Sequence, residues 1–444
     1  MRRNGASVVG DGLQKKTKTI AARRQNRIFE FPMIKKVKVE QLRPGVFIDR
    51  FDSGWLSHPF LFNRKRIKDR PAIDKMREWG VEYVYIDTDR GLDIEDTHHP
   101  RQAEPEAAVE IEFAEAAVES EPPLIHVPFQ EEIVAAKEVR SKARRVVHRL
   151  LDNVRSGGGI DIDEAHDLVT DMDSTVCRNK DALLLLMQVR SKDEYTFMHS
   201  VSVSALLIAF CRSMGLDGEA SRIIGLGGLL HDVGKMAVPL AILNKPAALT
   251  DAEFSIVKQH SLYCRDILDK MKQVPETAAL IARQHHERFD GSGYPYNLKG
   301  DEIAPAAQMA AIVDVFDAIT ADRCYRQGMD QVSALRKIYD WRSSHFNAKL
   351  VQQFIRCVGI YPPGTVVRLE SGRIAVVVEG TGSLLKPVVR VVYDAGQDWA
   401  IAPKDINLAR EDPQFGDRIA SYESPQRWRI DPFRVLGIGG VKLL

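Results

Sequence analysis

Cysteine is scarce in this 444-residue sequence, and its spacing excludes two classes of small crosslinked protein. The five cysteines are an odd number and include no Cys-x-x-Cys pair. A disulfide framework needs an even set of bridged cysteines, and a thiolate zinc site needs closely spaced pairs. We therefore expect reduced, mostly buried thiols at Cys177, Cys211, Cys264, Cys324 and Cys357.

Long apolar runs and an excess of one charge are also missing. The longest apolar stretches, such as 182–187 and 374–378, are far shorter than the ~18 residues that cross a bilayer. The 62 basic and 61 acidic side chains leave a formal net charge of +1, which argues against nucleic acid as a main partner. No apolar stretch typical of a secretory signal follows the basic N-terminus. We expect a cytoplasmic protein with no transmembrane segment and no nucleic-acid partner.

Two segments of biased composition divide the chain. Residues 1–32 are predicted to be a disordered basic tail, with a functional basic arm and an over-long start assignment as alternatives. Residues 93–132 hold 12 acidic side chains against one basic and several prolines, so we expect an acidic Pro-rich linker. Between them, residues 33–92 alternate apolar and polar residues around a helical segment at 71–79, which predicts a small α+β module.

The rest of the chain is mainly helical and then β-rich. Apolar residues recur at helical spacing from Val139 to Val154, and helical patterns continue to about residue 358. We expect a helical domain at 133–360, with its core at 185–360. Strand patterns at 365–369, 374–379 and 388–393 predict a small β-rich appendage within residues 361–444. The predicted fold class is therefore mainly α.

A group of histidines and aspartates carries the chemistry. His199 shares the apolar face of a predicted helix, and His231 and Asp232 end another apolar helix, followed at once by Lys235. Burying these side chains is costly unless they pair or coordinate a cation. The remaining members are His260, His285, His286 and the pair Asp314 and Asp317, which lie three residues apart on one face of a predicted apolar helix.

Counting donor atoms indicates two metal ions. Five imidazoles and two carboxylates make seven donors, or eight bonds if Asp232 bridges, whereas two six-coordinate ions need roughly twelve. About four positions remain for a hydroxide and phosphate oxygens, which fits a dinuclear hydrolase. Mixed imidazole and carboxylate donors without thiolates favour iron or manganese, with zinc, cobalt and nickel left open.

The motifs resemble those of a known family. His231-Asp232 and Gly293-Tyr294-Pro295, the latter within the string 285–295, look like the HD-GYP family of bacterial cyclic di-GMP phosphodiesterases. Segments 192–196 and 314–326 resemble the same family, so the likeness covers about residues 185–360. The N-terminal module resembles a domain of unknown function that often precedes HD-GYP domains.

The resemblance implies an all-helical HD-type metal-dependent phosphohydrolase domain that hydrolyses cyclic di-GMP to pGpG, with GMP as an open further product. A metal-bridging hydroxide would attack phosphorus in line, with Asp232 and Lys235 as catalytic residues. The implied metal ligands are His199, His231, Asp232, His260, His285, His286 and Asp314. The residues predicted to bind substrate are Lys235, Arg288, Gly291, Tyr294, Asp317, Arg323 and Arg326.

The sequence departs from the family pattern at two places. Tyr195 stands where some members have a glutamate that helps to hold a third metal, so we predict two metals. Phe346-Asn347-Ala348 replaces a frequent Phe-Asp-Pro, which predicts a looser local turn.

Two other functions and two questions of assembly remain open. The protein could be a degenerate module that binds a cyclic dinucleotide or a partner domain without turnover. It could also be a phosphohydrolase that acts on another cyclic dinucleotide or a nucleotide. GGDEF-type diguanylate cyclases, contacted through the Gly-Tyr-Pro loop, are an open class of partner, and the oligomeric state is open as well.

Overall fold

The computed structural model forms two compact units, residues 1–103 and 104–444. The predicted tail, the predicted linker up to residue 126, Arg323 and Arg326 lie outside the residues that the structure describes. The described residues are 34–51, 65–67, 69–78, 81, 83–87, 91–92, 127–189, 195–245, 247, 249–271, 273–321, 328–410 and 416–438.

The N-terminal unit is a four-stranded antiparallel sheet with one main helix. Val84 and Ile86 of the central strand β4 share one buried core with Ile73 and Met76 of the helix α2. The sheet order is β1-β4-β2-β3. The elements are β1 (Ile34–Lys38), η1 (Val39–Gln41), β2 (Phe47–Phe51), β3 (Lys65–Arg66), α2 (Arg70–Glu78) and β4 (Tyr83–Asp87). Among the described residues of this unit, no His, Cys, Asp and Glu side chains gather as a candidate metal site.

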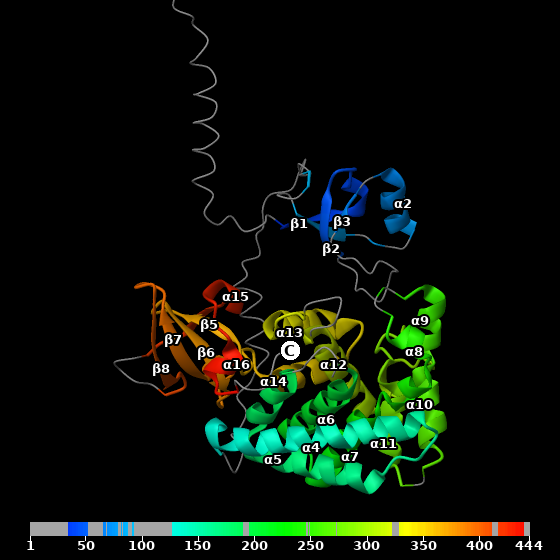
Figure 1. Cartoon of the computed structure of the whole chain (residues 1–444). Helices are drawn as coiled ribbons and strands as arrows, with labels where there is room; N and C mark the ends of the chain where they lie inside the picture. Colours follow the sequence, from blue (N-terminus) through cyan, green and yellow to red (C-terminus); the bar gives the residue numbers. More distant parts are fainter. Residues whose placement is uncertain are drawn as a thin grey trace, which may run out of the picture. The chain divides into compact units, whose positions relative to one another are not determined.

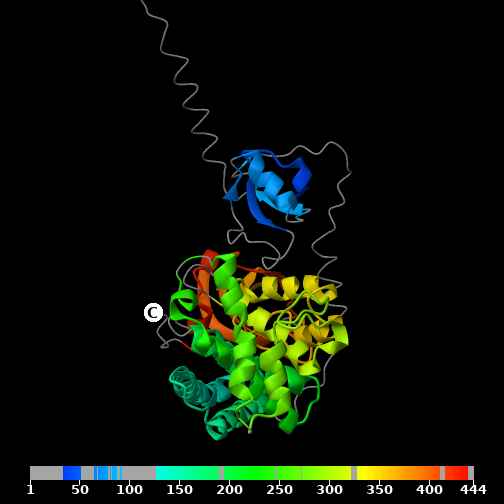
Figure 2. The same cartoon turned by 90° about the vertical axis from the view of Figure 1, so that its right-hand side faces the viewer.

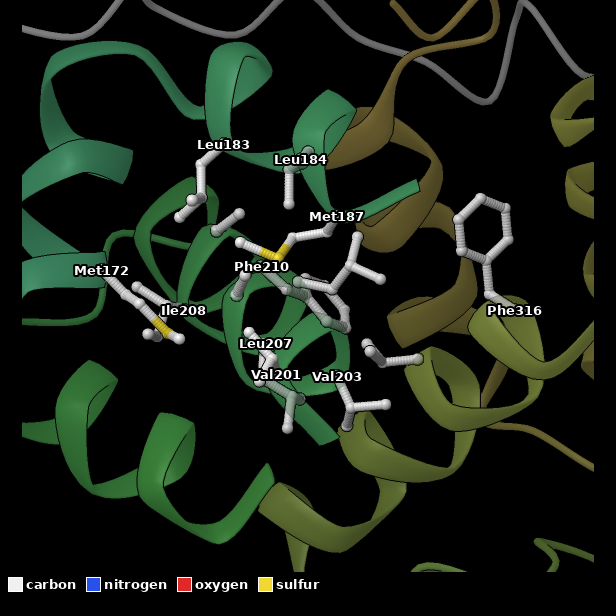
Figure 3. Packing of buried hydrophobic residues seen from close by; sticks show 14 of the residues in the cluster. Met172, Leu183, Leu184, Met187, Val201, Val203, Leu207, Ile208, Phe210 and Phe316 are labelled. Atoms are coloured by element: carbon white, nitrogen blue, oxygen red, sulfur yellow. The ribbon is translucent and has the colours of Figure 1, made fainter. Parts of the chain in front are cut away.

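Four long helices open the second unit and form its core. They are α4 (Phe129–Arg155), α5 (Ile162–Gln188), α6 (Tyr195–Ser213) and α7 (Gly218–Leu230). Helix α6 lies at the centre, and its residues Val203, Leu207 and Phe210 are fully buried. Figure 3 shows these side chains in one buried cluster with Met172 of α5 and Phe316, which comes from a later helix. Because apolar contact surrounds α6, a polar side chain on it is held in a fixed position.

Shorter helices follow and carry most of the candidate site. They are η3 (Val233–Ala237), α8 (Leu240–Leu243), α9 (Asp251–Lys258), α10 (His260–Leu268), α11 (Glu276–Gln284), η4 (Gly300–Glu302), α12 (Pro305–Thr320), α13 (Gln331–Asp340), η5 (Trp341–Ser343) and α14 (Ala348–Val358). Asn347 caps α14: its side chain accepts from the Lys349 N–H at 3.1 Å and donates to Gln308 at 2.9 Å. The turn that was expected to loosen is therefore held by these two bonds.

A C-terminal antiparallel sheet lies at one side of the helices (Figures 1 and 2). Its order is β8-β7-β6-β5-β9, and Ile374 and Val376 belong to the same buried core as the helices. Polar contacts add to this packing, since Asn179 of α5 donates to Glu379 at 2.8 Å. The elements are β5 (Val366–Leu369), β6 (Arg373–Glu379), β7 (Val388–Asp394), β8 (Trp399–Asn407), β9 (Ile419–Tyr422), α15 (Pro425–Trp428) and α16 (Pro432–Val435).

The predicted fold class is confirmed: a mainly helical domain with a small α+β module before it and a small antiparallel sheet after it. The strands β8 and β9 and the last two helices were not predicted. Strand β8 is mostly exposed and contains Pro403, which is tolerated because β8 is an edge strand.

No helix within the described residues is long and apolar enough to cross a membrane.

Helix α4 begins at Phe129, inside the segment predicted as linker. Its residue Glu132 is 3% exposed and accepts two hydrogen bonds from the Arg178 guanidinium, both at 2.8 Å. The segment was predicted to be a solvated linker because it is acidic, but one of its carboxylates, that of Glu132, is buried and links α4 to α5.

We predict that Glu132→Gln lowers the free energy of unfolding by about 2 kcal/mol, because the partly exposed Arg178 loses its paired charge. The exposed neighbour supplies a matched control, and Glu131→Gln should change stability by less than about 0.5 kcal/mol. Urea denaturation of both variants measures the difference. Equal midpoints for the two variants would contradict the assignment.

Candidate metal centre

Five segments of the helical domain bring imidazoles and carboxylates together in its interior. The described residues contain two groups whose candidate ligand atoms lie within 4.8 Å of one another. The first group is His199, His231 and Asp314, and the second is Asp232, His260, His285 and His286. All seven predicted ligands are therefore gathered, and every one except His286 is buried.

A close backbone approach places His231 and Asp232 beside His260. Gly234 lies so near α10 that a Cβ atom there would stand 2.0 Å from the His260 carbonyl oxygen. The Cys264 thiol donates to the His231 carbonyl at 3.1 Å and accepts from the Gly234 N–H at the same distance. Glycine at position 234 is required because any side chain would push η3 away from α10.

Asp232 lies between the two groups. Its Oδ2 is 3.3 Å from His231 Nε2 and 3.7 Å from His199 Nε2. Its Oδ1 is 3.4 Å from His260 Nε2 and 3.8 Å from His285 Nε2. Both Asp232 Oδ1 and His231 Nε2 are buried without a hydrogen-bond partner. Buried polar atoms are nearly always satisfied, so these two fit bonds to a cation.

Hydrogen bonds on the far side of three rings direct their other nitrogen into the centre. Each Nδ1 contacts a backbone carbonyl within its own helix or turn, which leaves Nε2 with the free lone pair. The contacts are His231 with Gly228 at 2.8 Å, His260 with Val257 at 2.7 Å, and His285 with Ile281 and Ala282 at 3.2 Å each.

His199 is held by two carboxylates of α12. Its Nε2 lies 3.0 Å from Asp314 Oδ1, and its Nδ1 lies 2.6 Å from Asp317 Oδ2. The spacing of three residues places both carboxylates on one face of α12. Asp317 is 2% exposed and lies behind the imidazole, a position suited to orienting the ring rather than to contacting a substrate.

Burial sets the protonation of the second group. It lowers the pKa of His260 to about 4 and that of His285 to about 3, and it lowers the pKa of His286 as well. These rings are neutral at neutral pH, as metal ligation requires.

At Asp232 and at His199, neighbouring groups of opposite charge outweigh the effect of burial on the pKa. Burial would raise the pKa of Asp232, but His231 and Lys235 outweigh it and hold the pKa well below its usual range. Burial would lower the pKa of His199, but its hydrogen bonds with Asp314 and Asp317 raise it to about 9. The carboxylates of Asp232, Asp314 and Asp317 therefore strongly favour a positive charge beside His199, either a cation or, without one, a proton on the ring.

Two of the predicted substrate-binding residues, Lys235 of η3 and Tyr294, contact the candidate ligands directly. The Lys235 ammonium donates to Asp232 Oδ2, and the Tyr294 ring lies 4.7 Å from the His286 ring, centroid to centroid. Arg288 donates to Ser292 at 3.3 Å, and Gly291 takes a positive φ of 86° in the turn that follows Arg288. Arg323, Arg326 and the Tyr195 side chain lie outside the described residues.

Glu287 is a positioning residue that the sequence analysis missed. It is 2% exposed and accepts the N–H groups of Tyr296 at 2.7 Å and Leu298 at 3.1 Å. These bonds hold the loop that carries Tyr294. The sequence could have indicated this role, because Glu287 directly follows the two histidines inside the motif string 285–295.

The fold and the paired clusters define an HD-domain protein with a candidate dinuclear metal centre. A family model described as an HD domain matches residues 183–350. A second model, a domain of unknown function, matches residues 34–165 and so extends past the predicted boundary at residue 92 into α5.

Comparison with known proteins of similar sequence identifies the family. The chain is 40% identical over 400 residues to a cyclic di-GMP phosphodiesterase of Pseudomonas aeruginosa, and the match covers 90% of this chain and 94% of the relative. The chain belongs to the family of that protein, and the predicted resemblance is confirmed.

Two more distant likenesses were found. A 3'3'-cGAMP-specific phosphodiesterase of Vibrio cholerae is 38% identical over 148 residues, which is 33% of this chain and 34% of the relative. A solved structure of an HDG"Y"P protein from Bdellovibrio bacteriovorus covers 72% of this chain and 98% of its own, at 17% identity and a TM-score of 0.43.

The histidine pKa values predict how the stability of the metal-free protein depends on pH. The unfolded chain binds a proton at His260 below pH 6.5, whereas the folded chain resists it down to about pH 4. The free energy of unfolding should therefore fall as the pH falls through this window, by about 3 kcal/mol from His260 alone. His199 does not oppose the trend, since below pH 6.5 it is protonated in both states.

Urea midpoints of chelator-treated protein between pH 7 and pH 4 measure this effect. His260→Gln should make the decline shallower, and His148→Gln, at an exposed histidine of α4, should leave it unchanged. A midpoint that stays constant, or rises, on acidification would show that these rings are not held neutral by burial.

Proposed function

We propose that this protein hydrolyses cyclic di-GMP to linear pGpG with two divalent cations. The observation that carries the proposal is the Asp232 carboxylate, which faces both histidine groups and keeps one oxygen without a hydrogen-bond partner. The 40% identity with a cyclic di-GMP phosphodiesterase over nearly the whole chain supports the substrate.

We assign the seven gathered side chains as metal ligands, with Asp232 shared. Two bound cations would supply the acidity that readies water for attack and positive charge that offsets the phosphate's. Imidazole and carboxylate donors without a thiolate favour iron or manganese. Two metals per chain, rather than three, is the expectation that follows from Tyr195.

The protein's own residues orient the substrate and stabilise charge. The Lys235 ammonium is held at the edge of the centre by Asp232, so it would contact the scissile phosphate and offset the negative charge that develops there. Arg288 and Tyr294 would contact the nucleotide from the loop ordered by Glu287. Water adds to phosphorus and the bond to the 3'-oxygen breaks, which leaves a 5'-phosphate and a 3'-hydroxyl.

Other parts of the expectation remain predictions. These are a second cleavage to GMP, nucleotide contacts by Arg323 and Arg326, binding of GGDEF-type cyclases through the Gly-Tyr-Pro loop, and a cytoplasmic location. The V. cholerae relative that acts on 3'3'-cGAMP keeps a different cyclic dinucleotide as the second candidate substrate.

Protein loaded with iron or manganese should contain two metal ions per chain and convert cyclic di-GMP to pGpG. The double variant His231→Ala/Asp232→Ala should lose the metal and reduce kcat/KM on the order of a thousandfold, because it removes ligands of both groups. Metal analysis and chromatography of the products measure the two effects.

His148→Ala, on the outer helix α4, is the control and should keep both properties. Competition between cyclic di-GMP and 3'3'-cGAMP identifies the preferred substrate. Absence of stoichiometric metal, or nucleotide binding without turnover, would overturn the proposal.

Asp317→Asn should weaken metal binding by roughly 10- to 100-fold, because the amide orients His199 less firmly than the carboxylate does. Titration of the chelator-treated protein with manganese measures the affinity, and Asp301→Asn, at an exposed aspartate, is the control. If Asp317→Asn binds manganese like the wild type, Asp317 has no orienting role.

A further inference from the structure

Lys258 is a cation beside the candidate centre that the proposed chemistry does not use. It is the last residue of α9, and its Nζ lies 4.8 Å from the ring centroid of Phe254 and 5.4 Å from that of Tyr294. The two aromatic faces attract the ammonium without neutralising it.

Lys245 and Lys235 differ from Lys258 because each donates hydrogen bonds to a carboxylate. Lys245 donates to both oxygens of Glu253, at 2.6 and 2.8 Å, and Lys235 donates to Asp232. Within the described part of the chain, no acidic side chain pairs with Lys258. Lys258 is partly buried, and its ammonium is therefore available to an anion that arrives from outside.

The position of Lys258 relative to the centre follows from one shared neighbour. The Tyr294 ring lies 5.4 Å from the Lys258 Nζ and also packs 4.7 Å from the ring of His286, centroid to centroid. The Tyr294 N–H also donates to the His286 carbonyl at 3.2 Å, which fixes the loop at this distance. Lys258 and His286, a member of the second histidine group, thus share Tyr294 as a common neighbour.

A cyclic dinucleotide has two phosphodiesters, each with one negative charge, and only one of them is cleaved at a time. The other phosphate enters a partly buried site with its charge intact, which is costly unless a cation pairs with it. Lys235 is held at Asp232, so it serves the scissile phosphate.

We propose that Lys258 binds the second, uncleaved phosphate of the cyclic dinucleotide and so selects substrates that carry two phosphates. The inference rests on the proposed function. It assigns Lys258 a role in binding and not in the chemical step.

The test compares a substrate with two phosphates and a substrate with one. For Lys258→Met with metal loaded, KM for cyclic di-GMP should rise about tenfold while kcat stays within about twofold, since one charge-assisted hydrogen bond is lost. For bis(p-nitrophenyl) phosphate, which has a single phosphate, kcat/KM should not change. Lys258→Arg should restore most of the affinity for cyclic di-GMP.

Lys270→Met is the matched control, because it removes the same charge from an exposed position. It should leave both substrates unaffected. Calorimetry adds a readout without turnover: Lys258→Met should weaken the binding of pGpG about tenfold and leave the binding of GMP unchanged.

Several results would overturn the inference. An equal loss on both substrates would place Lys258 at the scissile phosphate or show a structural role, and no change on either would show that it binds neither phosphate. A wild-type protein that cleaves bis(p-nitrophenyl) phosphate but not cyclic di-GMP would instead overturn the proposed function. Urea midpoints for Lys258→Met close to those of the wild type show that the fold is retained.

Discussion

The candidate centre of the helical domain depends on one carboxylate that lies between its two groups of histidines. Asp232 lies at the junction of α7 and η3, with one oxygen toward His231 and His199 and the other toward His260 and His285. A buried carboxylate is tolerable only where positive charge or hydrogen bonds compensate for lost hydration. The neutral rings of His260 and His285 bring no positive charge to their side of the carboxylate, so the arrangement is suited to cations.

The same constraint explains the rigid surroundings of the centre. Backbone carbonyls orient three of the rings, Asp317 orients His199, and the missing side chain of Gly234 lets η3 reach α10. Ligands that are held before metal binds lose little conformational entropy when it does. The stability of this region and its chemistry therefore have the same structural basis.

The loop beside the centre is supported from two directions. Glu287 holds its far side through backbone N–H groups, while the N–H groups of Phe289 and Asp290 donate to the carbonyls of His345 and Ser344. Arg288 and Tyr294 are thus carried on a loop whose backbone is fixed at several points. Such a loop can present a cation and an aromatic ring to a nucleotide at a defined distance from the metal ligands.

The sequence by itself determined the helical domain, the small module before it, the first strands of the appendage and the seven candidate ligands, because apolar periodicity and motif spacing are local properties. It did not reveal the strands β8 and β9, since an exposed edge strand lacks a strong apolar pattern. Only the tertiary structure decided which oxygen of Asp232 faces which histidines, that Asp317 lies behind His199, and that Glu287 and Lys258 flank the loop. These relations join residues far apart in the chain, and packing in three dimensions sets their distances.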